Sequence, residues 1–353
     1  MAVLSFAAGR KRTATMNRRK RKGRNSLVFL HLSRFAACHS SVTIIAALLQ
    51  CPAFFSSCSR VRETPAPSRK VTQIYLQSTK NTTADAVDLF FFDPSGAQNL
   101  DAYQQITDWN GSNAVYGLSG TGAKHLVALS GTAGETGRWW DIRNYGSLCK
   151  YTFSLADDSP DKPLLVGETD LQDALSRQLT LPLHPMLCQI RIRSVSCNFA
   201  GRPYAGADFR NSACYLAYAG TECFPVGTGD RPPASWINAG VLDSIALNSL
   251  PQPEMIAQEG WGSTGNTPRH PSRSLYCYPH PLTQVVLAGT LADMTCYYPI
   301  PLPDLQAGQC YELDITLRRM GSARPDIPVQ SDAYTLQMEA LPWDEHNTQT
   351  IPF

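Results

Sequence analysis

The stretch CYELDITLRRM, residues 310–320, decides the fold class. Apolar and polar side chains alternate along it, with Tyr311, Leu313, Ile315 and Leu317 in one set and Glu312, Asp314, Thr316 and Arg318 in the other. Because the side chains of a β-strand point alternately to its two faces, this period of two puts the apolar set on one face. The segment therefore predicts an antiparallel strand with one buried and one solvated face.

Similar strand-like segments flank this stretch and recur along the chain. Residues 282–292 (LTQVVLAGTLA), 294–302 (MTCYYPIPL) and 333–343 (AYTLQMEALPW) complete a run of four at the C-terminal end. Residues 71–78 (VTQIYLQS) and 86–93 (AVDLFFFD) begin a comparable run earlier in the chain. Many short strands separated by turn residues predict an all-β fold, here with two antiparallel β-sandwich domains.

One strand carries an irregularity that can be read from its pattern. In CQIRIRSVSCNF, residues 188–199, the apolar positions change parity between Ile192 and Val195. A change of parity would turn the apolar face outward unless one residue is inserted into the ladder. We therefore expect a β-bulge near Arg193–Ser194.

Two loops are expected to hold short helices. The segment 137–148 (GRWWDIRNYGSL) is expected to pack Trp139, Trp140 and Tyr145 inward from one short helix. The segment 235–250 (SWINAGVLDSIALNSL) is a second candidate helix. It lies in a Pro-, Gly- and Ser-rich insertion, 224–282, which is longer than an ordinary loop and is therefore a candidate carrier of function.

Charge is segregated to the N-terminal end of the chain. Of the 31 Lys and Arg residues, ten lie in residues 1–57, which contain no acidic residue, so residues 58–353 hold 21 basic and 29 acidic residues, a net charge of −8. An acidic body gives no reason to expect nucleic acid as a partner. The basic runs alone could form a nucleic-acid-binding arm.

The segment after the basic runs favours export instead. Residues 42–55 (VTIIAALLQCPAFF) are fourteen residues without charge, which is short for a membrane span of about 20 residues and normal for the apolar core of a signal peptide. A basic segment, an apolar segment and the small residues Ser56 and Ser57 succeed one another in the order of an export signal. The basic segment is long, and Met16 is a second candidate start.

Cys58 comes directly after these small residues and is the candidate lipidation site. In bacterial lipoprotein signals, cleavage before a cysteine makes it the first residue of the mature chain, so the cut here would fall between Ser57 and Cys58. Cys51 is a poorer candidate because Gln50 precedes it and Pro52 comes after it. The alternative is that Cys58 is a buried or disulfide-bonded cysteine. A thioether-linked diacylglycerol with an N-acyl chain would anchor the protein stably.

No motif for catalysis or cofactor binding is visible in the sequence. GLSGTGAKH, residues 117–125, lacks the spacing of a phosphate-binding loop and is better explained as a turn. The histidines are scattered without metal-ligand spacing, and no serine or cysteine nucleophile has a recognisable partner. The eight cysteines from Cys149 onward contain no CxxC pair and are expected to be mostly free thiols. We expect no enzyme, no cofactor and no metal site.

The order of these segments resembles the Bacteroidales fimbrillins and fimbrial anchor lipoproteins. The resemblance covers most of 58–343 and is carried by residues 87–93 with the PSG turn, 115–131, 162–168 (KPLLVGE), 179–195, 214–227 (CYLAYAGTECFPVG) and 310–329 with the later LPW. It implies two transthyretin-like β-sandwich domains. It also implies a fimbrial subunit in the bacterial outer membrane, exposed at the surface and serving cell adhesion.

The predicted organisation combines the resemblance with the strand pattern. Residues 1–57 form the signal peptide and 58–70 a polar, proline-containing tether. The N-terminal sandwich spans 71–175, and the C-terminal sandwich spans 176–353 with its insertion and a C-terminal tail.

The resemblance distinguishes two roles. Stalk subunits lose their lipid and first strand to an arginine-specific protease, and a neighbour's C-terminal strand fills the resulting groove, whereas anchor subunits keep both. Here Arg60, Arg62 and Arg69 all precede the first expected strand, and the next arginine is Arg138. Cleavage would therefore leave that strand in place, which favours an anchor or accessory subunit.

The tail DEHNTQTIPF, residues 344–353, is the candidate donor strand, with Asn347, Gln349, Ile351 and Phe353 on one face. Pro352 cannot donate a ladder hydrogen bond, and a frayed terminus is the alternative. Expected partners are other fimbrial subunits, the outer membrane through the covalent lipid, and a ligand on a host or bacterial surface. A surface glycan-binding lipoprotein and a lipid-anchored hydrolase are the alternative functions; exposed aromatic residues in the insertion would favour glycan binding.

Overall fold

The computed structural model covers most of the chain after residue 67. It describes residues 68–78, 86–107, 109–110, 113–132, 138–172, 178–227, 236–239, 242–250, 252–260, 264–271 and 274–343. The predicted signal peptide, the lipidation site at Ser57–Cys58 and the donor strand in 344–353 lie outside these ranges and stay predictions. The predicted domain boundary between residues 175 and 176 also lies outside these ranges, but the strand at 178–185 pairs with the first strand of the chain, so the N-terminal sandwich extends beyond that boundary.

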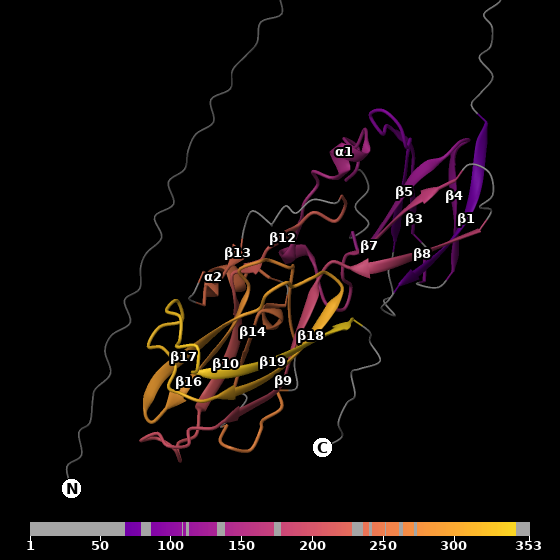
Figure 1. Ribbon diagram of the computed structural model, residues 1–353. Helices are drawn as coiled ribbons and strands as arrows, with labels where there is room; N and C mark the ends of the chain where they lie inside the picture. Colours follow the sequence, from indigo (N-terminus) through magenta and orange to yellow (C-terminus); the bar gives the residue numbers. More distant parts are fainter. Residues whose placement is uncertain are drawn as a thin grey trace, which may run out of the picture. The chain divides into compact units, whose positions relative to one another are not determined.

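Strands dominate the regular structure of the described residues (Figure 1). They comprise nineteen β-strands, against two α-helices of four residues and two 3-10 helices of three residues. The predicted all-β class with short helices in loops is confirmed.

The first strands of the chain form one rolled sheet. It contains β1 (Arg69–Ser78), β2 (Val87–Phe92), β3 (Leu100–Ile106), β4 (Ala114–Gly120), β5 (Lys124–Ser130), β7 (Leu165–Leu171) and β8 (Gln178–Pro185), in the order β3-β2-β5-β7-β8-β1-β4. β7 and β8 share only two residue pairs, so the sheet folds over between them. Its two halves enclose a core that includes Ile74, Leu76, Leu89, Phe91, Leu126, Leu181 and Leu183. This is the N-terminal sandwich.

Strand β2 is buried on both faces. Leu89 and Phe91 face the sandwich core, while Phe90 and Phe92 face a second hydrophobic cluster, and all four are fully buried. The second face is covered by the segment that carries α1 (Tyr145–Leu148), β6 (Phe153–Ser154) and the 3-10 helix η1 (Leu155–Asp157). Burial on both sides explains why this strand is a continuous apolar run rather than an alternating one.

The helix expected over 137–148 is largely wrong. Of its described residues, 138–148, only Tyr145–Leu148 are helical, because the Asn144 side chain accepts a hydrogen bond from the Ser147 amide and caps the helix there. Trp139 is buried and packs edge-on against Phe90, with ring centroids 5.2 Å apart, but Trp140 is 75 % exposed. Because the two tryptophans precede the helix, they do not share a helical face.

The later strands form two further sheets that enclose a second core. One has the order β14-β10-β16-β17 and the other β15-β9-β18-β19. The strands are β9 (Cys188–Cys197), β10 (Arg210–Ala217), β14 (Ala257–Glu259), β15 (Ser274–Cys277), β16 (Gln284–Leu291), β17 (Met294–Pro301), β18 (Gln309–Leu317) and β19 (Tyr334–Pro342). Apolar side chains of both sheets belong to one buried cluster, so this is the second sandwich.

Strand β18 has the predicted faces. Leu313, Ile315 and Leu317 are fully buried. In the pairing with β9, Leu313 lies opposite Ile192 and Asp314 lies opposite Ser194, so Arg193 is the extra residue of a bulge. The β-bulge predicted near Arg193–Ser194 is confirmed.

The insertion 224–282 is mostly irregular within its described residues. Besides β14 and β15, it contains β13 (Trp236–Ile237), which pairs with β11 (Ala219–Gly220), and α2 (Ser244–Leu247) and η2 (Pro253–Met255). The helix expected over 235–250 is wrong except for α2, as far as the described residues 236–239 and 242–250 show. Just before the insertion, β12 (Glu222–Cys223) pairs with β6, so the chain following β10 is hydrogen-bonded to the segment that covers β2. In the structure, none of the eight described cysteines from Cys149 onward is joined to another.

Candidate functional site

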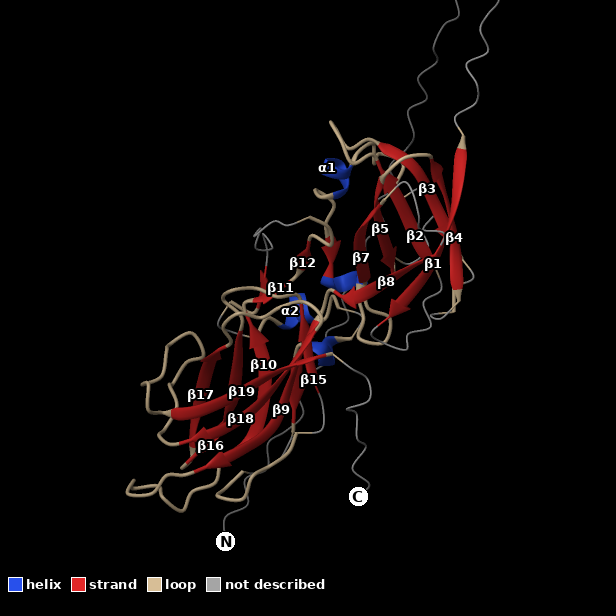
Figure 2. Ribbon diagram, turned by 45° about the vertical axis from the view of Figure 1, so that its right-hand side comes forward, coloured by secondary structure: helices blue, strands red, loops and turns tan. Residues whose placement is uncertain are grey.

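Strand β1 is the first described element of the chain and lies between β8 and β4 in the strand order, not at an edge of its sheet. Figure 2 shows these three strands in the N-terminal sandwich. Strand β1 pairs antiparallel with β4 over seven residue pairs and parallel with β8 over six. The alternation of VTQIYLQS sends Thr72, Ile74 and Leu76 into the sandwich, where each is at most 2 % exposed. Because β1 is paired on both edges and buried on one face, the sandwich depends on it for its stability.

Loss of β1 would leave a groove of defined shape. Burial of Ile74 and Leu76 stabilises the fold by about 1.5–3 kcal/mol each, before the ladder hydrogen bonds are considered. A typical domain has a net stability of only about 5–15 kcal/mol. The groove between β4 and β8 would therefore need another apolar-alternating strand to fill it. We treat β1 and its two neighbours as the candidate assembly site.

Two backbone amides of β4, an edge strand of the sheet, already donate hydrogen bonds to side chains of β3. The Gly120 amide donates a hydrogen bond of 2.6 Å to Asp101 Oδ2, and the Leu118 amide donates to Gln104 Oε1. Both acceptors are side chains of β3. These contacts cover part of an edge that would otherwise be open to pairing with another chain.

The arginine nearest to the candidate assembly site is Arg69, the first residue of β1. Arg69 opens β1 and lies opposite Gly120, and the pairs with β4 continue from Lys70 to Tyr75. The next arginine in the sequence, Arg138, lies beyond β5. A cut after Arg69 would therefore leave all but one of the residue pairs that hold β1.

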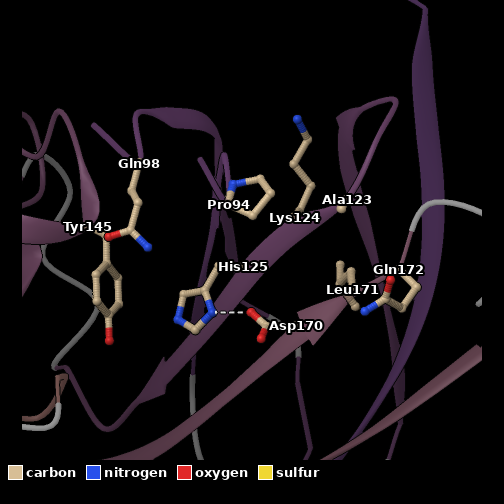
Figure 3. A pocket seen from close by; sticks show the side chains of 9 residues that line it. All are labelled: Pro94, Gln98, Ala123, Lys124, His125, Tyr145, Asp170, Leu171 and Gln172. Carbon is tan, nitrogen blue, oxygen red and sulfur yellow. Dashed lines mark hydrogen bonds and ion pairs between the residues drawn. The ribbon is translucent and has the colours of Figure 1, made fainter. Parts of the chain in front are cut away.

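A polar pocket lies at the N-terminal end of β5 (Figure 3). Its volume is about 430 Å³, and it is lined by Pro94, Gln98, Ala123, Lys124, His125, Tyr145, Asp170, Leu171 and Gln172. His125 stands between the Asp170 carboxylate and the Tyr145 ring, whose centroid is 4.8 Å from that of the imidazole. The His125 Nδ1–Asp170 Oδ1 distance is 2.7 Å, and His125 Nε2 lies 3.2 Å from Glu168 Oε2.

Hydrogen bonds, burial and nearby charges shift the pKa values of His125 and Glu168 in this cluster. Hydrogen bonding to Glu168, and more weakly to Asp170, raises the pKa of His125 against the opposing effect of its burial. Burial alone would raise the pKa of Glu168, but the hydrogen bonds from His125, Tyr145 and the Gly227 amide lower it overall. The hydrogen bonds and ion pairs join side chains of β5, β7 and α1, so the arrangement has the character of a network that fixes these three elements together.

These shifts make the stability of the fold depend on pH. The raised pKa of His125 means that its contribution is complete below about pH 6.5 and is lost as the pH rises through the folded-state pKa. The lowered pKa of Glu168 means that its contribution is complete above about pH 4.3 and is lost as the pH falls through its own folded-state pKa. Both are present together between about pH 4.3 and 6.5.

We therefore expect His125→Gln to lower the melting temperature most near pH 5.5 and least above pH 8. The partly exposed network limits the loss to at most about 1 kcal/mol. Melting curves from pH 4.5 to 9 check this, with His184→Gln, at an exposed position of β8, as the control. An equal loss at every pH would show that the imidazole acts only by packing.

The sequence pattern does not reveal this cluster. His125 is one of several scattered histidines there, because its partners Glu168 and Asp170 come 43 and 45 residues later. Only the pairing of β5 with β7, which places His125 opposite Asp170, brings them together. No group of ligands suited to a metal ion occurs in the part of the chain that the structure describes, nor does that part contain an apolar helix long enough to cross a membrane.

Solved structures of other proteins share this arrangement of strands. A candidate cell adhesion protein from Parabacteroides distasonis superposes with a TM-score of 0.58 at 12 % identity, over 79 % of this chain and 98 % of that one. One from Bacteroides eggerthii gives 0.57 at 17 %, over 78 % and 96 %. Fimbrilin from Porphyromonas gingivalis gives 0.54 at 13 %, over 77 % and 98 %.

The chain has the fimbrillin fold. The likeness spans nearly the whole length of each of these proteins, so it includes both sandwiches. No protein-family profile and no curated protein sequence matches the chain, so the likeness to fimbrillins rests on structure and on the order of segments in the sequence. The resemblance predicted from the sequence is confirmed at the level of the fold.

Proposed function

We propose that this protein is a fimbrial subunit with an anchor or accessory role. The fold is that of a fimbrilin and of candidate cell adhesion proteins, which supports a place in a surface fimbrium. The anchor or accessory role is proposed because Arg69 stands at the start of β1 and no further arginine occurs before Arg138. A protease that cuts after arginine would leave β1 in its groove, so the subunit would not accept a donor strand.

The proposed attachment runs through Cys58 to the outer membrane. Cleavage after Ser57 and lipidation of Cys58 would place the tether 58–70 between the lipid and β1. The other end of the chain supplies the second connection. Trp343 is 5 % exposed and its amide donates to Gly308, so the tail 344–353 starts from a fixed point of the second sandwich. In this proposal the tail enters the open groove of the last stalk subunit by strand complementation.

A structural role of this kind needs no catalytic residues. The proposed partners are other fimbrial subunits and the lipid bilayer. The proposed biological role is adhesion of the cell to a host or bacterial surface. The subunit is thus proposed to be no enzyme and to hold no cofactor.

Treatment of the purified protein with an arginine-specific protease tests the role. We expect trimming up to Arg69, no loss of β1 and no filaments, because the pairs from Lys70 onward stay intact. Mass spectrometry of the new N-terminus and electron microscopy are the measurements. Filaments that form from the protein trimmed at Arg69 would make it a stalk subunit.

A surface glycan-binding lipoprotein is the second candidate. Trp236, in the insertion, is 42 % exposed, and its ring centroid lies 5.2 Å from that of His280. An exposed aromatic face of this kind can stack on a sugar ring. Retention on immobilised glycans that disappears in Trp236→Ala, with adhesion lost at the same time, would favour this function over the anchor.

A further inference from the structure

Two cysteines face each other across the pairing of β9 with β15. Cys188 lies directly opposite Cys277 in this antiparallel pair. Their sulfur atoms are 3.7 Å apart, and the Cys188 thiol also lies 3.2 Å from the Cys277 carbonyl oxygen. Both side chains are fully buried. The two thiols therefore already have the backbone relation that a cross-strand disulfide requires.

The neighbouring cysteine on β18 is placed differently. Cys310 lies opposite Gln189 in the parallel pairing of β18 with β9, one position away from Cys188. Cys197, at the other end of β9, lies 3.3 Å from the carbonyl oxygen of Thr264. Cys188 and Cys277 thus differ from Cys310 and Cys197, because they lie opposite each other in an antiparallel pair of strands.

We propose that Cys188 and Cys277 are joined by a disulfide in the exported protein. The inference rests on export, which is part of the proposed function, because disulfides form and persist outside the cytosol. A bond length of about 2.05 Å requires the sulfur atoms to approach by less than 2 Å, which small rotations of the two side chains can supply.

The chemistry is a thiol–disulfide exchange with an oxidising disulfide, either of an oxidoreductase or of glutathione. One cysteine, as its thiolate, attacks a sulfur of the oxidant and forms a mixed disulfide, releasing the first oxidant thiol. The second cysteine then displaces the other oxidant thiol. The protein loses two hydrogen atoms, with two electrons passing to the oxidant, which becomes two thiols.

Burial places this reaction before the final packing of β15. The hydrogen bond with Cys188 and burial together raise the pKa of Cys277, so the folded thiol is a poor nucleophile. Exchange is therefore expected while β15 is still open. After β15 closes, the same burial shields the disulfide from reductants.

The bond would secure the end of the insertion. β15 is an edge strand of four residues, and the next residue, Tyr278, is fully buried and donates a 2.8 Å hydrogen bond to Asp158. Asp158 follows η1, in the segment that covers β2. A link from β9 to Cys277 would keep this strand from detaching and would hold Tyr278 on Asp158.

The test is made on the full chain, exported by its host and purified after free thiols are blocked with N-ethylmaleimide. Tryptic peptides 178–191 and 274–318 are expected to be linked before reduction and separate after it, with the linked mass two hydrogens lower. Since the second peptide also holds Cys296 and Cys310, a Cys310→Ala chain is mapped beside the wild type. The link is expected to persist in Cys310→Ala and in the control Cys214→Ala.

Cys277→Ala is expected to abolish the link. Because this change also alters packing, stability is compared in the wild type alone, refolded with oxidised glutathione or with its thiols kept reduced. The oxidised form is expected to melt about 5 °C higher. Blocked Cys188 and Cys277 in the unreduced protein, or a link from Cys188 to Cys310, would overturn the proposal. Failure of the protein to reach the cell envelope would instead reject the export on which it rests.

Discussion

A chain with Lys80→Arg is expected to form filaments after treatment with an arginine-specific protease, whereas the wild type is not. Position 80 lies after β1, so a cut there together with the cut at Arg69 would separate β1 from the rest of the chain. The substitution keeps the positive charge and adds only a cleavage site. It would therefore convert the proposed anchor into a subunit that accepts a donor strand.

The size of the effect depends on the place of β1 in its sheet. The excised strand is held by non-covalent contacts alone, and these include two ladders and the burial of Ile74 and Leu76. An empty groove would expose the core between β4 and β8, so the vacated subunit is stable only when another strand occupies it. The tail of a second copy, 344–353, is the proposed occupant, and each copy both donates and accepts, so the association is expected to continue into filaments.

Two control chains make this result specific. Lys80→Gln has no new cleavage site and should behave as the wild type. Lys80→Arg without residues 344–353 should be cut but should not polymerise, and size-exclusion chromatography with electron microscopy distinguishes the three outcomes. If the cut Lys80→Arg chain remains monomeric although β1 has left, the tail cannot serve as a donor strand and the strand-complementation proposal fails.

The features that the sequence predicted well are those in which burial repeats along a single strand. Leu313, Ile315 and Leu317 are buried as their alternation predicted, and the change of parity after Ile192 located the bulge at Arg193. Both signals are local, because a sheet face forces the period of two on every strand that it buries on one side.

The features that the sequence missed depend on contacts between distant segments or on a local cap. The helical spacing of 137–148 predicts a buried Trp140, but the Asn144 cap starts the helix too late to include it. The cluster of His125, Glu168 and Asp170 requires the register of β5 against β7. Likewise, the opposition of Cys188 and Cys277 could not be read from their spacing, because 89 residues, including β10 and most of the insertion, separate them.

The largest expected change in location comes from Cys58→Ala. The wild type should incorporate labelled palmitate and sediment with the outer membrane, whereas Cys58→Ala should carry no label and should leave the membrane fraction. A matched chain with Cys51→Ala should stay labelled and bound, because Cys58 would remain the residue after the cut.

The charge of residues 58–353 makes the expected difference in membrane binding nearly complete. Residues 58–353 carry a net charge of −8, so an anionic membrane surface would repel the body rather than retain it. No described helix could hold the chain in a bilayer in place of the lipid. The apolar stretch 42–55, if it stays uncut in the variant, is shorter than the ~20 residues that a span needs. A second chain, in which an ordinary cleavable signal peptide replaces residues 1–58, removes that stretch altogether. Retention of both variants in the membrane fraction at the wild-type level would show that Cys58 is not the anchor.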